Sequence, residues 1–170
     1  MTLKPRQPAP ALAVKTLGGG NWRLQDAKPK SFTMIVVYRG LHCPLCKAYL
    51  GELESKLSEF EKRGVEVMAM STDSLDRAQQ AQSLWGLNRL RMGYELPIET
   101  ARDWGLFVSR VVREGEPPQF TEPGLFLVKP DSSLFIASVA NTPWARPPLD
   151  QMLKGIDVFI ERNLLARGEA

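Results

Sequence analysis

The two cysteines of the chain, Cys43 and Cys46, lie in the segment VVYRGLHCPLCKAYL, where an apolar run gives way to a helical pattern. A Cys-x-x-Cys pair beside a strand and a helix is a signal of thiol redox chemistry, whereas an isolated free cysteine is usually a small buried hydrophobe. A redox pair, a metal site and an inert structural pair are the three interpretations. The redox pair is favoured because two cysteines at this spacing, with a proline between them, form a much rarer arrangement.

The position of Cys43 predicts which thiol reacts first. If Pro44 takes the first helical position, where its missing N–H costs nothing, Cys43 becomes the helix cap. Its sulfur then lies against unpaired backbone N–H groups at the positive end of the helix dipole, which stabilises a thiolate. Cys46, one turn later on the apolar side, is expected to be the more buried thiol and to resolve whatever Cys43 captures.

A metal-binding or metal-delivery module is the alternative from another class. His42, Cys43 and Cys46 could supply three ligands to Zn or Cu(I). The chain has one histidine and no second cysteine pair, so a fourth ligand is not evident. His42 is otherwise a partly exposed loop residue or a group that tunes the thiolate, and no bound cofactor or metal is expected.

Six segments around the cysteines have clear patterns. SFTMIVVY is a continuous apolar run typical of a strand covered on both faces, and apolar residues then recur at helical spacing from Cys46 until Gly64. The other segments are a two-stranded N-terminal hairpin (11–27, turning at Gly18–Gly20), a buried strand ending in a cap-like cluster (65–74), a helix (75–87) and a second hairpin (124–140).

The remaining segments are a short strand near Ile98, a helical turn through Ala101 to Trp104, and an ordered loop over RVVREGEPPQFTEP. A last helix follows RPPLD, and its apolar side is formed by Leu149, Met152, Leu153, Ile156, Phe159, Ile160 and Leu164. This order predicts an α/β fold, a mixed central sheet with helices on both faces and an N-terminal β-hairpin. Sites in such sheets lie beyond the carboxyl ends of the parallel strands.

Length and charge narrow the class of protein. The chain has 170 residues and 44% apolar residues, which predicts one domain over 11–170 after an extended, proline-rich segment over 1–10. The net charge of +3 is scattered, so nucleic acid is not an expected partner. No apolar run has the length of a membrane span or a signal peptide, and a soluble, cytoplasmic protein is expected.

Four segments, YRGLHCPLC, MSTDS, ARDWGLF and EPGLFLVKPDSSLF, resemble the thioredoxin-like proteins of the alkyl hydroperoxide reductase and thiol-specific antioxidant (AhpC/TSA) superfamily. The resemblance runs from about Pro10 to the final helix and is nearest to a peroxiredoxin-like subgroup with a C-P-x-C site. It implies a thioredoxin-like fold, with Cys43 as the attacking cysteine and Cys46 as its partner. It also places the proline that is usually cis in thioredoxin folds at Pro123, beside the sulfurs, where it would help bind an extended partner.

Two departures from the family pattern affect the expected substrate. A typical peroxiredoxin site has Thr or Ser three residues before the attacking cysteine and Arg just before a later core strand, whereas this chain has Gly40 and Pro123 there. Arg39 could replace the lost charge, and the other candidates, which the sequence does not rank, are Arg110, Arg113 and Arg146.

The expected function is a thiol oxidoreductase that cycles between the Cys43/Cys46 dithiol and disulfide. It would reduce disulfides readily and peroxides more slowly, with electrons from an external thiol donor, either thioredoxin- or glutaredoxin-like or a small thiol. A dedicated peroxiredoxin-type peroxide reductase is the alternative, and a homodimer is possible.

Overall fold

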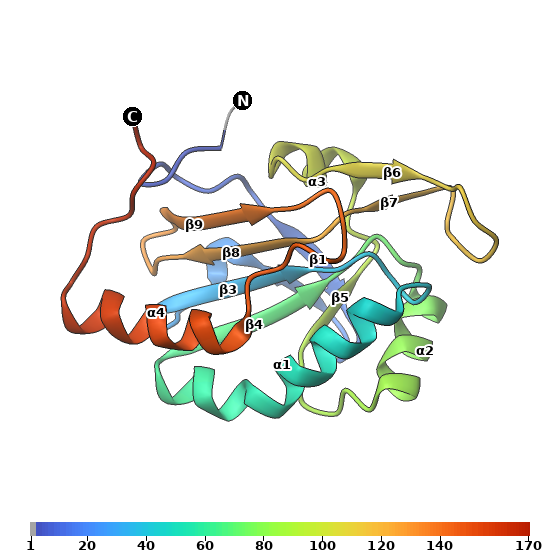
Figure 1. The fold of residues 1–170 in the computed structure, drawn as a ribbon, viewed down its shortest axis with the longest axis horizontal. Coiled ribbons are helices and arrows are strands. Elements are labelled where there is room, and N and C mark those ends of the chain that lie inside the picture. Colours follow the sequence, from blue (N-terminus) through green and yellow to red (C-terminus); the bar gives the residue numbers. More distant parts are fainter. Residues whose placement is uncertain (1–2) are drawn as a thin grey trace.

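The computed structural model describes residues 3–170, so the first two residues of the extended segment expected over 1–10 lie outside it. A seven-stranded mixed sheet in the order β2-β1-β5-β4-β3-β8-β9 forms the centre, and the hairpin β6-β7 projects beside it (Figure 1). The strands are β1 (Ala13–Thr16), β2 (Asn21–Arg23), β3 (Phe32–Val37), β4 (Val65–Met70), β5 (Met92–Tyr94), β6 (Val108–Arg110), β7 (Gln119–Thr121), β8 (Gly124–Val128) and β9 (Leu134–Val139). The helices are α1 (Pro44–Lys62), α2 (Leu75–Trp85), α3 (Ile98–Asp103) and α4 (Leu149–Glu161), with a 3-10 turn at Leu24–Asp26.

The central strand β3 is buried along its whole length, as its continuous apolar run predicts. It pairs in parallel with β4 and antiparallel with β8, so its backbone groups are bonded on both sides. The predicted N-terminal hairpin is also present, since β1 pairs antiparallel with β2. Strand β1 additionally joins the sheet through β5, which makes the hairpin one edge of the main sheet.

Helices cover both faces of the sheet, which confirms the predicted architecture (Figure 1). Helices α1, α2 and α4 pack on one face, and the apolar positions of α1 all lie on its buried side: Cys46, Leu50, Leu53, Leu57 and Phe60. The short helix α3 and the N-terminal part of the chain cover the other face, where Trp104 packs edge-on against Phe126 at 4.9 Å between ring centroids.

The strand predicted near Ile98 is wrong. Ile98 is the first residue of α3, and the extended backbone of Pro97 caps that helix. The strand in this region is β5, which is only three residues long and forms two residue pairs with β4. A strand this short has no readable alternation, because one apolar residue followed by glycine fits many structures.

Two further predictions need correction. The predicted loop over 110–123 is largely a hairpin, since β6 and β7 pair from Val108↔Thr121 to Arg110↔Gln119 around an exposed turn. The last helix is shorter than its apolar pattern, because it ends at Glu161 and Asn163 takes left-handed backbone. Leu164 therefore lies outside the helix, and Ile160 near its end is 48% exposed.

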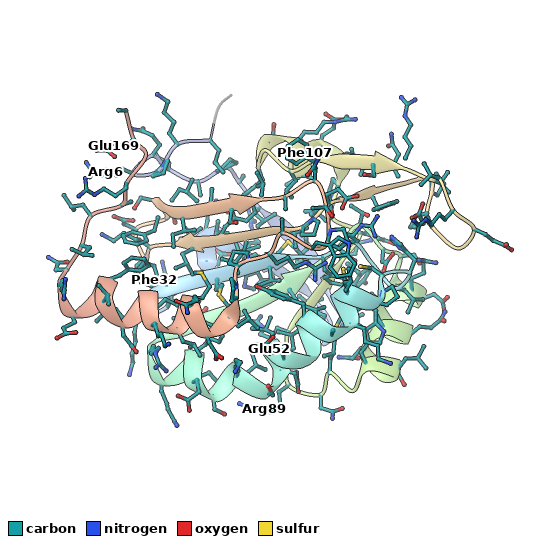
Figure 2. All side chains as sticks on the ribbon, in the orientation of Figure 1. Arg6, Phe32, Glu52, Arg89, Phe107 and Glu169 are labelled. Atoms are coloured by element: carbon teal, nitrogen blue, oxygen red, sulfur yellow. The ribbon has the colours of Figure 1, made fainter. Side chains whose placement is uncertain are left out.

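The two ends of the chain meet beside β9. Figure 2 shows Arg6 and Glu169 close together, and their ion pair measures 3.0 Å. The backbone N–H of Arg6 donates to the carbonyl of Leu134 at 2.8 Å, which ties the N-terminal segment to the start of β9. Among residues 3–170, no helix combines the length and apolarity needed to cross a membrane.

Candidate active site

The site forms where β3 and β4 end, at the carboxyl edge of the parallel pair, as the sequence predicts. The N–H of Tyr38 donates to the carbonyl of Met70 at 3.0 Å, so the segments that follow β3 and β4 leave the sheet side by side. The N–H of Leu41 then donates to the buried carboxylate of Asp73 at 2.8 Å. These bonds fix the loop that carries Cys43 against the loop that follows β4.

Cys43 caps α1, and Pro44 is the first helical residue, which confirms both predictions. The Cys43 sulfur accepts a hydrogen bond from the N–H of Cys46 at 3.3 Å. Cys43 is only 1% exposed, so its sulfur interacts mainly with protein groups and little with solvent. A thiolate here is stabilised by the first N–H groups of the helix and by its dipole.

The surroundings of Cys43 lower its pKa to about 5, and the largest cause is a hydrogen bond from the Cys46 thiol. The backbone N–H of Cys46, a hydrogen bond from the Arg39 side chain and the charge of Arg146 lower the pKa further. Burial opposes these effects but does not outweigh them. Cys43 is therefore the thiolate of the pair at neutral pH.

Cys46 is fully buried, with none of its surface exposed. Burial raises its pKa far above the usual range, and the hydrogen bond to Cys43 raises it further, because a donor must keep its proton. Its sulfur accepts from the N–H of Arg39 at 3.4 Å and from Nη2 of Arg146 at 2.7 Å. The two cysteines are thus held in different protonation states.

Arg39 lies between Cys43 and the β6-β7 hairpin. Its Nε is 3.0 Å from a carboxylate oxygen of Glu122, its Nη2 is 4.0 Å from one of Glu116, and its guanidinium lies 4.9 Å from the centre of the Phe120 ring. These contacts hold the Arg39 guanidinium in place, and the Arg39 side chain lowers the pKa of Cys43. The supporting role of Arg39 stays a prediction.

Gly40 stands where the family places a hydroxyl, and the structure shows why no side chain is found there. A Cβ at this position would lie 2.7 Å from Oδ1 of Asp73, and the Gly40 φ of 135° is one that other residues rarely adopt. Asp73 also binds the side chain of Arg77, with Nε 3.0 Å from the carboxylate. A buried carboxylate therefore occupies the space beside position 40.

His42 lies apart from the sulfur contacts. Its ring packs edge-on against Phe120 at 4.6 Å between centroids, and Nδ1 is 3.5 Å from Nη2 of Arg77. Burial lowers the pKa of His42, and the charge of Arg39 lowers it further, so the ring is neutral at pH 7. Within residues 3–170, no group of three or more histidine, cysteine or acidic side chains is arranged to hold a metal ion, so the alternative ligand set of His42, Cys43 and Cys46 has no such geometry.

Pro123 immediately precedes β8, and the peptide bond before it is trans, as is every other peptide bond of residues 3–170, so the cis geometry implied by the resemblance is absent. It still lies near the site, since it lines one small hollow together with Tyr49 and Arg146. Its carbonyl accepts from the N–H of Ala140 at 3.0 Å, which occupies one of the groups expected to meet a partner.

The four candidate arginines take different places. Arg39 and Arg146 both reach the sulfurs, whereas Arg110 and Arg113 are exposed on the β6-β7 hairpin. Sequence reasoning named Arg146 only as one possibility. Its position in the loop between the last strand and the last helix, at the same rim of the sheet, was the available signal.

Comparison with known proteins identifies the family. The model of the AhpC/TSA family matches residues 5–135, which is most of the chain. The chain belongs to the AhpC/TSA family. A 1-Cys peroxiredoxin of Dictyostelium discoideum is 27% identical over 121 residues, covering 71% of this chain and 45% of that protein. A probable 1-Cys peroxiredoxin of Syntrichia ruralis is 33% identical over 57 residues, covering 34% of this chain and 26% of that protein. The chain thus spans less than half the length of these relatives.

Solved structures establish the fold. Peroxiredoxin 6 of Arenicola marina superposes with a TM-score of 0.79 at 18% identity, covering 95% of this chain and 76% of that one. Peroxidoxin BcpB of Mycobacterium tuberculosis gives a TM-score of 0.74 at 13% identity, covering 92% and 98%. The thioredoxin-like fold expected for an AhpC/TSA protein is therefore confirmed.

Proposed function

We propose that this AhpC/TSA protein is a thiol-dependent peroxide reductase in which Cys43 attacks the peroxide and Cys46 resolves the product. One observation carries the proposal. Cys43 caps α1, its sulfur accepts from the N–H of Cys46 at 3.3 Å, and the side chains of Cys46 and Arg39 lower its pKa to about 5. Low thiol pKa, a fixed cation and a second thiol within bonding reach are what peroxide reduction by a dithiol requires.

The reaction has three steps. The Cys43 thiolate attacks one peroxide oxygen, the O–O bond breaks, and the departing oxygen takes a proton to leave as water or an alcohol. The resulting Cys43 sulfenic acid is attacked by Cys46, which loses its proton as the S–S bond forms and water departs. Two equivalents of an external thiol then return the disulfide to the dithiol and are themselves oxidised to a disulfide.

We infer that peroxide is preferred over disulfides, the reverse of the preference that the sequence indicated. Disulfide reduction was expected to be faster because the family's hydroxyl and arginine are missing at Gly40 and Pro123. However, Arg39, in the segment that leads to Cys43, lowers the pKa of that thiol, and Arg146, in the loop before α4, donates to the Cys46 sulfur. A fixed donor to the departing oxygen contributes about 2.7–4 kcal/mol in comparable sites. Burial of Cys43 to 1% exposure also favours a small peroxide over a bulky disulfide.

Disulfide reduction is the second activity we infer, because the Cys-Pro-Leu-Cys pair at a helix start is suited to exchange once a thiol gains access. The electron donor is proposed to be an external thiol, either a thioredoxin- or glutaredoxin-like protein or a small thiol. We also propose that the protein forms a homodimer and acts in the cytoplasm.

The test compares two substrates in stopped-flow single turnovers. Reduced protein is mixed with hydrogen peroxide or with a small aromatic disulfide, and loss of thiols is followed. We expect saturable or second-order oxidation by peroxide that is lost in Cys43→Ser and reduced at least ten-fold in Arg39→Gln. Arg110→Gln is the matched control, because it removes an exposed arginine outside the site and should leave the rate unchanged. Rapid disulfide exchange with negligible peroxide oxidation would contradict the proposal and restore the preference indicated by the sequence.

A further inference from the structure

Arg146 comes from the loop between β9 and α4, about a hundred positions after the cysteines, yet it contacts their helix directly. Its Nη2 donates to the Cys46 sulfur at 2.7 Å, and its Nη1 donates to the carbonyl of Leu45 at 3.3 Å. The guanidinium also lies 5.1 Å from the centre of the Tyr49 ring, and the Tyr49 hydroxyl donates to the carbonyl of Pro147 at 2.7 Å. Three contacts therefore hold this arginine on the second cysteine.

The charge of Arg146 has no carboxylate to balance it. In the part of the chain that the structure describes, 3–170, no acidic oxygen lies within 4.0 Å of its nitrogens, and its buried Nε has no hydrogen-bond partner. Most half-buried arginines in this fold are paired with an acid, as Arg39 is with Glu122 and Arg63 with Asp157. The ionisable group to which Arg146 donates a hydrogen bond is the thiol of Cys46.

We propose that Arg146 is a catalytic residue of the second half of the cycle, where it stabilises the thiolate of Cys46. It acts twice, when Cys46 attacks the oxidised Cys43 and again when Cys46 is the leaving group during reduction by an external thiol. The inference rests on the proposed function, whose chemistry it deepens.

The negative charge moves between the two sulfurs during the cycle. In the reduced protein Cys43 carries the charge, and Cys46 keeps its proton because it is buried and because it donates to that sulfur. Oxidation of Cys43 to a sulfenic acid removes the second of these effects, and Cys46 is left facing the Arg146 cation, which favours loss of its proton. Cys46 then loses its proton, its electron pair forms the S–S bond, the S–O bond of Cys43 breaks, and water is released.

Reduction of the disulfide uses the same contact between Arg146 and Cys46. An external thiolate attacks the Cys43 sulfur of the disulfide, the S–S bond breaks, and its electron pair goes to Cys46, where Arg146 stabilises it. A leaving thiol of lower pKa departs faster, so the cation directs attack to Cys43. A second external thiolate then attacks the sulfur of the first external thiol in its mixed disulfide with Cys43. This step releases the oxidised donor and the Cys43 thiolate.

The experiment separates the two steps at pH 8, where Cys43 is ionised. Reduced protein is mixed with one equivalent of hydrogen peroxide and quenched at intervals, and mass spectrometry measures free thiol, disulfide and the dimedone adduct of the sulfenic acid. In Arg146→Gln we expect the first oxidation to stay within a few-fold of the wild-type rate. Disulfide formation should slow roughly ten- to a hundred-fold, the loss for one charge-assisted bond, and the adduct should accumulate.

Two further variants keep the result interpretable. Arg146→Lys retains a cation and should form the disulfide faster than Arg146→Gln, and Arg162→Gln, which removes an exposed arginine outside the site, should match the wild type. The pH at which disulfide formation reaches half its maximum should rise in Arg146→Gln. The groups that act on Cys46 besides Arg146 are Cys43, the buried phenol of Tyr38 and the N–H of Arg39, and all of them are retained.

The outcomes separate the inference about Arg146 from the proposed function. If peroxide oxidises Cys43 in the wild type but Arg146→Gln forms the disulfide at the wild-type rate with an unshifted pH profile, the inference about Arg146 is overturned and the proposed function stands. Equal rates in the lysine and glutamine variants would overturn it as well. If peroxide does not oxidise wild-type Cys43 at all, the proposed function itself fails.

Discussion

Substituting Gly40 by alanine should destabilise the protein strongly, because two separate costs meet at this position. The added Cβ would lie 2.7 Å from one carboxylate oxygen of Asp73 and 2.9 Å from the other, both closer than real contacts. Overpacking of this kind typically costs about 1–3 kcal/mol. The φ of 135° adds backbone strain of about 1–3 kcal/mol for a residue with a side chain.

Together these costs predict a loss of about 2–6 kcal/mol in the free energy of unfolding, a large part of the total stability of a domain. Denaturant titration followed by circular dichroism measures this loss. Gly18→Ala is the matched control, since no atom lies within 4 Å of its added Cβ and its φ is not positive, and it should change stability little.

A double-mutant cycle separates the two costs. In an Asp73→Ala background the carboxylate is gone, so the further loss caused by Gly40→Ala should fall to the strain alone, about 1–3 kcal/mol. A loss below 1 kcal/mol for the single variant would refute the reasoning. An equal loss in both backgrounds would show that the carboxylate does not occupy the space beside position 40.

Four other predictions follow from the site and the core. Because the Arg39 side chain lowers the pKa of Cys43, Arg39→Gln should raise that pKa from about 5, so that iodoacetamide alkylation reaches half its maximal rate at a higher pH, and an unchanged profile would contradict this effect of Arg39. His42→Ala should leave that alkylation profile within a few tenths of a pH unit, because His42 contacts Phe120 and Arg77 instead of the sulfurs, and a large shift would show that it tunes the thiolate. Cys46→Ser should still be oxidised by peroxide but should stop at a sulfenic acid that dimedone traps, and a variant that cannot be trapped would argue against Cys46 as the resolving thiol. Phe60→Ala should lower the free energy of unfolding by about 3–5 kcal/mol in denaturant titration, since this ring is fully buried on the inner side of α1. A loss below 1 kcal/mol would mean that the core repacks around the cavity.

The sequence predicts the centre of the site because its determinants are local. The apolar run that becomes β3, the proline at the first position of α1 and the spacing of the two cysteines lie within one short segment. The helix cap and the apolar side of α1 follow from backbone geometry and helical period, which need no knowledge of the rest of the fold. The assignment of Cys43 as the low-pKa thiol follows from the same geometry.

The parts that the sequence did not predict depend on contacts between distant residues. Arg146 reaches Cys46 across a hundred positions, and nothing in the residues around it distinguishes it from an exposed arginine. The carboxylate of Asp73 meets Gly40 only because β3 and β4 pair in parallel and end together. The β6-β7 hairpin and the position of β5 were also missed, since three-residue strands are stabilised by their partners and have little pattern of their own.

The stoichiometry of one oxidation tests directly whether Cys43 and Cys46 reduce peroxide as a pair. Reduced protein is mixed with one equivalent of hydrogen peroxide in a rapid-quench apparatus, remaining peroxide and free thiols are counted, and peptide mapping identifies the product. We expect one peroxide to be consumed for two thiols lost within the first fast phase. The product should be an intramolecular Cys43–Cys46 disulfide. Two thiols still free after the peroxide has been mixed, or a disulfide that joins two chains, would contradict it.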